Sequence, residues 1–337
     1  MNKITIKTLA KELQLSVSTV SKAMRDSHEI SAETKLRVND LARKLNYVVN
    51  PYASSLGTRA SKTIGVVIPE VVDSFFALAI NGIESVAQEN GYHVLIYLTH
   101  ECQEKEKNIL KDFESGRVDG VLMSVSRDTQ DHDSIVDLMN SGIPFVFFDR
   151  VMEEMETTQI TTNDQESAYL ATRHLLEKDC KRILFLAFST SLSISNKRLQ
   201  GYKDALTAQH IAVDMDNILT LTQDADGDYQ RLKDKLQSPN RPDGVLASVE
   251  KLAMPIYQAC AELNLKIPDD LQVISFSNLG TAAYLNPPLT TITQPAFEMG
   301  KTAATALMKM LKRRGEVLVK EEIVIPSALV LRKSTKA

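Results

Sequence analysis

The sequence predicts an α/β protein that consists of a small helical head and a two-lobed core of parallel sheets. The first fifty residues hold short amphipathic helices. From Thr63 onward, short apolar runs alternate with amphipathic helices, and the same alternation begins again at Gln165. Such βαβ alternation is typical of a parallel sheet covered by helices on both faces. With 337 residues, the chain is long enough for two or three domains.

The head begins with two short helices joined by a tight turn. Thr5 can cap the first helix, Ile6 to Leu13, and Ser16 suits the N-cap of the second helix, which ends near Arg25. One side of the second helix is apolar, and the other side is small, polar and cationic. This second side contains Val17, Ser18, Ser21, Lys22 and Arg25. A small cationic face fits the major groove of DNA, although an ordinary solvated helix has the same pattern.

A third helix is predicted to begin at Ser31, with Val38, Leu41 and Leu45 on its inner side. Three short helices with a tight turn before the second are typical of a helix-turn-helix unit. The charge distribution agrees, because residues 1–62 contain 11 Lys and Arg but 5 Asp and Glu, whereas the remainder contains 28 and 38. A basic head on an acidic body indicates a polyanionic partner for the head alone.

A short segment at residues 50–62 separates the head from the core. Pro51 fits the first turn of a helix and Gly57 fits its end. Isolated helices shorter than about 12 residues are marginal in water, so we expect this one to fold only when something packs against it. A plain interdomain linker is the alternative.

The core should contain two similar lobes. In the first lobe we expect strands at Ile64–Ile68, Val94–Tyr97, Val121–Val125 and Pro144–Phe148, and helices at Phe75–Asn90, Glu104–Ser115 and Ser134–Asn140. In the second lobe we expect helices at Gln165–Glu177, Lys197–Gln209 and Glu250–Leu263, and strands at Arg182–Ala187, Gly244–Ser248 and Val273–Phe276. The chain then continues with a long helix, Ala296–Arg313, and strands at Ile323–Ile325 and Ala328–Leu331.

Open parallel sheets bind ligands at the carboxyl ends of their strands, and two facing lobes form a cleft there. The loops at these ends provide seven candidate effector residues: Phe75, Phe76, Ser124, Asp149, Arg198, Ser277 and Asn278. Asp149 accepts hydrogen bonds and Arg198 donates a planar pair, which together suit vicinal hydroxyls or a carboxylate. The alternatives are a core role for Phe76 and a surface ion pair between Asp149 and Arg198.

Enzyme, metal and membrane motifs are missing from the sequence. It has no dinucleotide-binding glycine pattern, no phosphate loop and no nucleophile elbow. Asp131-His132-Asp133 lies in a polar loop, where we expect it to be solvated, so we predict neither a metal nor another cofactor. The N-terminus lacks an apolar signal region, and Cys102, Cys180 and Cys260 lack metal spacing, which favours a cytoplasmic protein with reduced thiols.

The N-terminal fifty residues resemble the lactose/galactose-repressor (LacI-type) family. The similarity rests on Thr5-Ile6, Leu9-Ala10, the run Leu15 to Lys22, Ile30-Ser31, Leu45-Asn46-Tyr47 and Asn50-Pro51, in this order. Thr8 departs from the usual acidic residue, which should weaken the capping box at Thr5. The resemblance implies a hinge helix that folds on DNA, with Leu56 as a wedge in the minor groove. It implies DNA contacts from Thr5, Ser16, Val17, Ser18, Thr19, Ser21, Lys22, Tyr47, Asn50, Ala53 and Leu56.

The core also resembles this family, whose regulatory domain is built like a periplasmic sugar-binding protein. The matching segments include Val118–Val121, Asp149-Arg150, Arg198–Tyr202, Ile267–Ile274 and Pro288–Pro295. The resemblance implies a helix-turn-helix domain at 1–49, a hinge at 50–62 and a core at 63–337. Lobe one would comprise about 63–162 and 291–325, and lobe two about 163–289 and 326–337. The chain would cross between the lobes near Thr162–Asn163, Leu289–Thr291 and Pro326.

Together these observations predict a ligand-responsive transcription regulator, a repressor of carbohydrate-utilisation genes that binds a pseudo-palindromic operator as a homodimer. The effector would be a saccharide or a derivative. Ser277 and Val249 replace an aspartate and an asparagine of many sugar-binding members, so a modified, acidic or larger saccharide, or a ligand that is not a sugar, stays open. A solute-binding protein without a role in transcription is the alternative. The sequence names neither the operator nor the sign of regulation.

Overall fold

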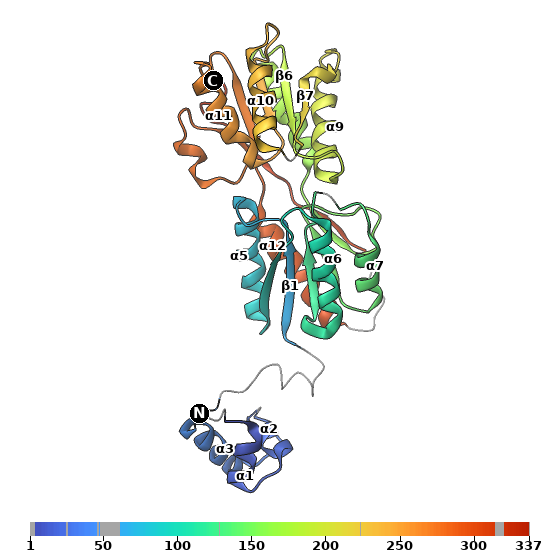
Figure 1. Ribbon diagram of the computed structural model, residues 1–337, viewed down its shortest axis with the longest axis vertical. Coiled ribbons are helices and arrows are strands. Elements are labelled where there is room, and N and C mark those ends of the chain that lie inside the picture. Colours follow the sequence, from blue (N-terminus) through green and yellow to red (C-terminus); the bar gives the residue numbers. More distant parts are fainter. Residues whose placement is uncertain are drawn as a thin grey trace. The chain divides into compact units, whose positions relative to one another are not determined.

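The computed structural model describes residues 4–24, 26–45, 47, 61–127, 129–222, 224–313 and 320–336. It divides into two compact units, Met1–Ser61 and Lys62–Ala337 (Figure 1). The predicted hinge helix, with Asn50, Ala53 and Leu56, lies outside the described residues.

The described residues of the head form the helices α1 (Ile6–Leu13), α2 (Val17–Met24) and α3 (Ala32–Lys44). Leu9, Val20 and Val38 are fully buried at their centre, one from each helix. The capping box at Thr5 is present with Thr8 in the acidic position, although both of its hydrogen bonds are long. Thr8 N donates to Thr5 Oγ1 at 3.4 Å, and Thr5 N donates to Thr8 Oγ1 at 3.3 Å. The Thr8 hydroxyl therefore accepts the backbone N–H of Thr5, which a carboxylate accepts in the usual capping box.

The first lobe is built on a six-stranded parallel sheet. Its strands, in spatial order, are β11 (Glu322–Val324), β5 (Thr158–Thr161), β4 (Phe145–Phe148), β3 (Gly120–Met123), β1 (Thr63–Ile68) and β2 (His93–Leu98). Its helices are α5 (Ser74–Glu89), α6 (Gln103–Asp112) with a π-turn at Phe113–Arg117, α7 (Asp133–Asn140) and α12 (Ala296–Lys312). Helices α5 and α12 pack on one face of the sheet, and α6 and α7 pack on the other.

Two glycines bring α5 and α12 unusually close together. A Cβ at Gly82 would lie 2.1 Å from the backbone oxygen of Phe297, and a Cβ at Gly300 would lie 2.0 Å from that of Ala79. Since neither contact leaves room for a methyl group, the two helices meet backbone to backbone.

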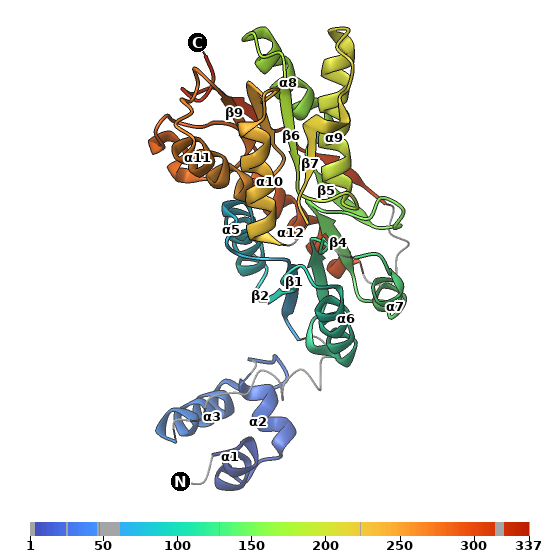
Figure 2. The ribbon, with the colours of Figure 1, turned by 45° about the horizontal axis from the view of Figure 1, so that its top comes forward.

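The second lobe repeats this plan with a six-stranded sheet. Its strands, in spatial order, are β12 (Ala328–Val330), β10 (Thr290–Thr293), β9 (Gln272–Phe276), β8 (Gly244–Ala247), β6 (Ile183–Ala187) and β7 (Ile218–Thr220), and β12 is antiparallel to β10. Helices α8 (Asp164–Glu177) and α9 (Ser193–Ala208) cover one face, and α10 (Ala225–Gln237) and α11 (Ala253–Glu262) cover the other (Figure 2). Short 3-10 turns occur at Met215–Asn217, Glu250–Leu252 and Gly280–Tyr284.

The chain passes between the lobes after β5, after β10 and after β11. The predicted crossing at Leu289–Thr291 is wrong, because Thr290–Thr293 pairs with β9 and β12 inside the second sheet. That crossing lies at Gln294-Pro295, between β10 and α12. Strands β5, β7 and β10 and helix α10 were not predicted.

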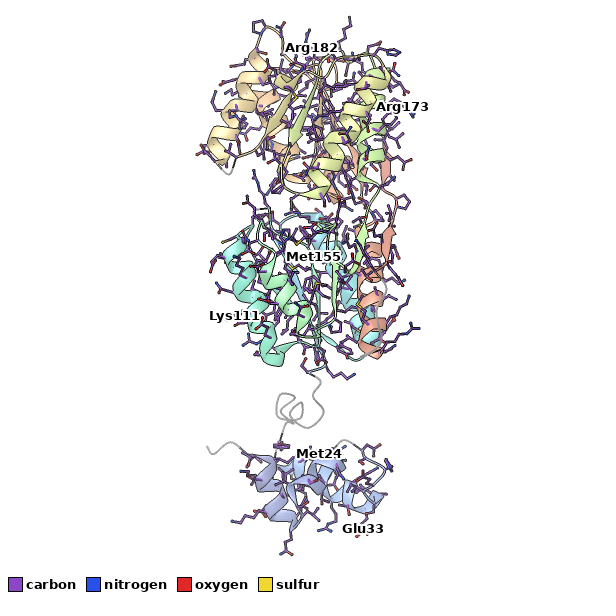
Figure 3. The ribbon with its side chains drawn as sticks, turned by 90° about the vertical axis from the view of Figure 1, so that its right-hand side faces the viewer. Met24, Glu33, Lys111, Met155, Arg173 and Arg182 are labelled. Atoms are coloured by element: carbon purple, nitrogen blue, oxygen red, sulfur yellow. The ribbon has the colours of Figure 1, made fainter. Side chains whose placement is uncertain are left out.

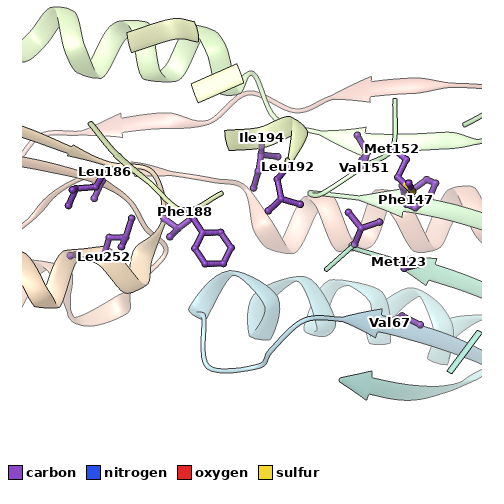
Figure 4. Packing of buried hydrophobic residues seen from close by; sticks show 14 of the residues in the cluster. Val67, Met123, Phe147, Val151, Met152, Leu186, Phe188, Leu192, Ile194 and Leu252 are labelled. Carbon is purple, nitrogen blue, oxygen red and sulfur yellow. The ribbon is translucent and has the colours of Figure 1, made fainter. Parts of the chain in front are cut away.

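One hydrophobic cluster extends through both lobes (Figure 4). It includes Val67 and Phe147 of the first lobe and Leu186, Phe188 and Leu252 of the second. Charged side chains such as Lys111, Arg173 and Arg182 are exposed at the outer surface (Figure 3). The two lobes therefore form one unit with a continuous interior.

Candidate DNA-reading helix and effector site

Helix α2 presents the face that the sequence predicts. Ser16 Oγ accepts the backbone N–H of Thr19 at 3.0 Å, so Ser16 is the N-cap. Val20 and Ala23 are buried against the other two helices, while Val17 and Ser18 are exposed. The short side chains of the exposed face leave the backbone of α2 free to approach a groove closely.

Three other predicted DNA contacts have structural partners within the head. Lys22 forms an ion pair with Glu29, so its charge is shared in the absence of DNA. Thr5 caps α1, and Tyr47 packs partly buried against the head core. Ser21 is half-buried, and Thr19 Oγ1 lies 2.8 Å from Ser16 Oγ.

The carboxyl ends of the strands from both lobes meet at a cavity of about 30 Å³. Six of the seven predicted effector residues line it: Phe75, Phe76, Asp149, Arg198, Ser277 and Asn278. The seventh, Ser124, is fully buried, lies outside this lining, and accepts the backbone N–H of Arg150 through its hydroxyl at 3.4 Å. A water needs about 10–15 Å³, so the cavity has room for water but is too small for a saccharide unless the lobes or side chains move.

Arg198 is buried at the centre of this site. Its Nε donates to Asp164 Oδ1 at 2.7 Å and its Nη1 donates to the backbone oxygen of Ser248 at 2.5 Å. The guanidinium lies 4.0 Å from the ring centroid of Phe276. The alternative of a surface ion pair between Asp149 and Arg198 is therefore wrong, because Arg198 pairs with Asp164 and all three charged side chains are buried.

Asp149 follows β4 with a left-handed backbone, φ 61°, and its side chain is buried. Burial raises the pKa of Asp149 to about 6, while the positive charges of Arg150 and Arg198 oppose this shift. Gln294 Nε2 donates to Asp149 Oδ1 at 3.2 Å, and Arg150 Nε lies 3.9 Å from Asp149 Oδ2. Among the described residues this buried Nε–H has no hydrogen-bond acceptor. A ligand hydroxyl between the two side chains could accept from Arg150 Nε and donate to Asp149 Oδ2.

Glu250, which the sequence did not single out, joins the two lobes. Its Oε1 accepts the backbone N–H of Ser74 at the start of α5, at 3.0 Å. Its Oε2 accepts Ser277 Oγ and the backbone N–H of Asn278, both at 2.8 Å. This carboxylate therefore links donors from both sides of the cleft. Its position directly after Val249, in a loop at a strand end, was the available signal.

Phe75 and Phe76 both line the cavity and belong to the core. Their rings meet edge to face with centroids 5.3 Å apart. The Phe76 ring also meets the Phe148 ring edge to face, with centroids 6.5 Å apart. Only 2% of Phe76 is exposed and it belongs to the core cluster, which confirms the alternative of a core role; a platform for a ligand ring stays a prediction.

The remaining candidates show no site. Asp131 binds Lys107 at 2.6 Å, and His132 lies 3.1 Å from Glu154. Within the part of the chain that the structure describes, no group of His, Cys, Asp and Glu could hold a metal, and no helix is long and apolar enough to cross a membrane. The three cysteines are unpaired, and burial raises the pKa of Cys180 to about 12.

Known proteins share both parts of this architecture. Residues 5–50 match the family described as bacterial regulatory proteins, lacI family, and residues 172–335 match a periplasmic binding protein-like domain. The ribose operon repressor of Haemophilus influenzae is 31% identical over 332 residues, which cover 98% of both chains.

The chain belongs to the lacI family of bacterial regulatory proteins. It is therefore a DNA-binding transcriptional regulator with a ligand-responsive core, as the sequence predicted. The match of the head decides against a solute-binding protein without a role in transcription.

Two solved structures of lacI-family proteins resemble the chain. A LacI family regulator from Enterococcus faecium with bound ribose is 28% identical, with a TM-score of 0.70, over 81% of this chain and 98% of that one. A Lac repressor dimer bound to operator covers 100% of both chains with a TM-score of 0.84. At 22% identity, this second likeness supports the fold alone.

Proposed function

We propose that this regulator is a cytoplasmic homodimeric repressor of carbohydrate-utilisation genes that acts by binding and not by catalysis. Its two heads read the halves of a pseudo-palindromic operator, with the exposed face of α2 in the major groove. A neutral, polyhydroxylated effector of the size of a pentose binds between the lobes and changes operator affinity.

The arrangement of charges in the inter-lobe site carries this proposal. Arg198 and Arg150 are already paired with Asp164 and Glu101, so the site offers no full positive charge to an acidic ligand. What it does offer is the carboxylate of Asp149 and two buried N–H groups without a hydrogen-bond acceptor among the described residues, Nε of Arg150 and Nη2 of Arg198. Such a set accepts from and donates to hydroxyl groups. The names of the ribose operon repressor and of the ribose-bound structure support a pentose.

A thermal-shift screen of the full chain tests the effector. We expect D-ribose or another neutral pentose to raise the melting temperature, and sugar phosphates to have less effect. An effector found in this way should change operator affinity at least tenfold. Stabilisation by phosphorylated sugars alone would contradict a neutral effector.

The second experiment tests DNA binding by the head. An operator is selected from a random DNA pool, and its affinity is then measured by fluorescence anisotropy at several salt concentrations. The logarithm of the affinity should fall with that of the salt concentration at about −0.9 per phosphate contact. If Lys22 meets a phosphate, Lys22→Met reduces this slope by about one. Lys111→Met, on the exposed surface of α6, is the matched control and should leave the slope unchanged. Equal slopes for both variants would exclude Lys22 from the contact.

A further inference from the structure

The second lobe contains an apolar cavity of about 260 Å³ that is separate from the effector site. It lies between the β6–β7 edge of the sheet and the helices α10 and α11. Apolar side chains form most of its wall: Leu186, Phe188, Leu219, Leu221, Leu232, Leu252 and Pro255. No residue of this wall lines the effector cavity.

The volume and lining of this cavity suit one aromatic ring. The cavity is partly open to solvent, so it is an apolar pocket and not a closed void in the interior. An engineered cavity of about 150 Å³ lined by similar side chains stays dry and binds benzene. The present cavity has room for a ring together with one small substituent.

Arg127, Phe188 and Lys251 separate this cavity from a wider cleft of about 690 Å³, because all three line both spaces. Arg127 donates to the backbone oxygen of Leu221, and its guanidinium carbon lies 4.9 Å from the ring centroid of Phe188. The Lys251 ammonium lies 4.0 Å from the same centroid. A ligand that enters from the cleft therefore passes two cations before it reaches the apolar wall.

Lys251 forms no ion pair within the described residues, although Glu70 lines the same cleft and other acidic groups lie nearby. Several of these other groups are engaged elsewhere. Glu250 accepts from Ser74, Ser277 and Asn278, as described above. Glu101 accepts from Arg150 and from the backbone N–H of Arg127. Asp228, at the other side of the cavity, accepts from Thr222 and pairs with Arg231. Burial lowers the pKa of Lys251, while the negative charges of Glu70, Glu101 and Asp73 oppose this shift.

We propose that this cavity is a second ligand site that binds a small aromatic monocarboxylate, with the ring against the leucines and the carboxylate at Lys251 and Arg127. Lys251 is adjacent in sequence to Glu250, which bridges the lobes. Occupancy of the cavity therefore adjusts the loop that holds the effector site closed.

Fluorine NMR and calorimetry on the full chain test the proposal, with 4-fluorobenzoate, its neutral isostere 4-fluorobenzamide, and acetate as probes. We expect the benzoate to bind at least tenfold more tightly than the benzamide, and acetate not to bind. Lys251→Met should reduce benzoate affinity to that of the benzamide. Lys266→Met, at an exposed lysine of the same lobe, should have no effect.

Leu232→Phe, which fills the cavity from α10, should abolish binding of both aromatic probes. Circular dichroism and operator binding will show that this variant is folded; if it is not, Leu221→Phe fills the same space from the end of β7. Absence of benzoate binding, or binding that survives both Lys251→Met and a folded filling variant, overturns the proposal. If a pentose displaces the benzoate by direct competition, with an apparent pentose affinity that keeps falling as benzoate is raised and reaches no plateau, the benzoate lies in the effector site and the proposal is also overturned. Because pentose binding is measured separately, failure here leaves the proposed repressor function standing.

Discussion

Replacing Arg198 by Met should destabilise the second lobe as well as weaken effector binding. The side chains of Arg198 and Asp164 are 2% and 1% exposed, and the closest nitrogen and oxygen are 2.7 Å apart. When one partner of a buried ion pair is removed, the other charge stays buried without compensation, which costs about 3–5 kcal/mol. We expect Arg198→Met to lower the free energy of opening of the second lobe by this amount.

Hydrogen exchange on peptides from β6, β8 and α8 of the full chain measures this loss locally, without requiring that all parts of the chain unfold together. Arg173→Met, at an exposed position on α8, is the control and should change the opening free energy by less than about 0.5 kcal/mol. The double variant Arg198→Met with Asp164→Leu removes both charges and should recover most of the stability. An Arg198→Met variant within about 1 kcal/mol of the parent, or a double variant no better than the single one, would refute this reasoning.

Three further predictions concern single side chains. In the parent, the free energy of unfolding should fall by up to about 3 kcal/mol as the pH rises from about 4 to 6, because the raised pKa of Asp149 lets the folded chain keep a proton that the unfolded chain releases. Asp149→Asn should remove this fall, and an unchanged pH profile in denaturation experiments would contradict the prediction. Glu250→Ala should speed hydrogen exchange at the Ser74 amide and widen the core in small-angle scattering without effector, whereas an equally protected amide would show that the bridge is weak. Ser16→Ala should destabilise the head by about 1 kcal/mol in thermal denaturation and weaken operator binding, while Ser115→Ala, on an exposed side chain in the core, should do neither.

The elements predicted well are those whose signal is local. Helix α1 was expected and found at Ile6–Leu13, because its cap and apolar stripe lie within eight residues. Strand β5, Thr158–Thr161, was missed because three of its four residues are polar, although all are buried between β4 and β11. This segment is a strand because it pairs with β4 and β11, and no pattern within the segment itself indicates that pairing.

The same distinction applies to the effector site. Strand ends place Asp149 and Ser277 at one cavity, and this could be predicted from the alternation of strands and helices. Arg198 reaches the same cavity from within helix α9, and not from a strand-end loop as predicted. The partner of Arg198 could not be predicted. Asp164 is the first residue of another helix, α8, where an acidic residue is common, so nothing in the sequence indicates that its carboxylate binds Arg198. Glu250 was hidden for a similar reason, because a bridge depends on the distance between lobes.

The backbone contact between α5 and α12 restricts which residues the first lobe accepts at two positions. A Cβ at Gly82 or Gly300 would meet backbone atoms of the facing helix, which cannot rotate away as a flexible side chain could. Side chains of both helices, such as Ile83 and Met299, belong to the same hydrophobic cluster. An alanine at either glycine would therefore push the two helices apart, and the gaps left in that cluster would destabilise the lobe.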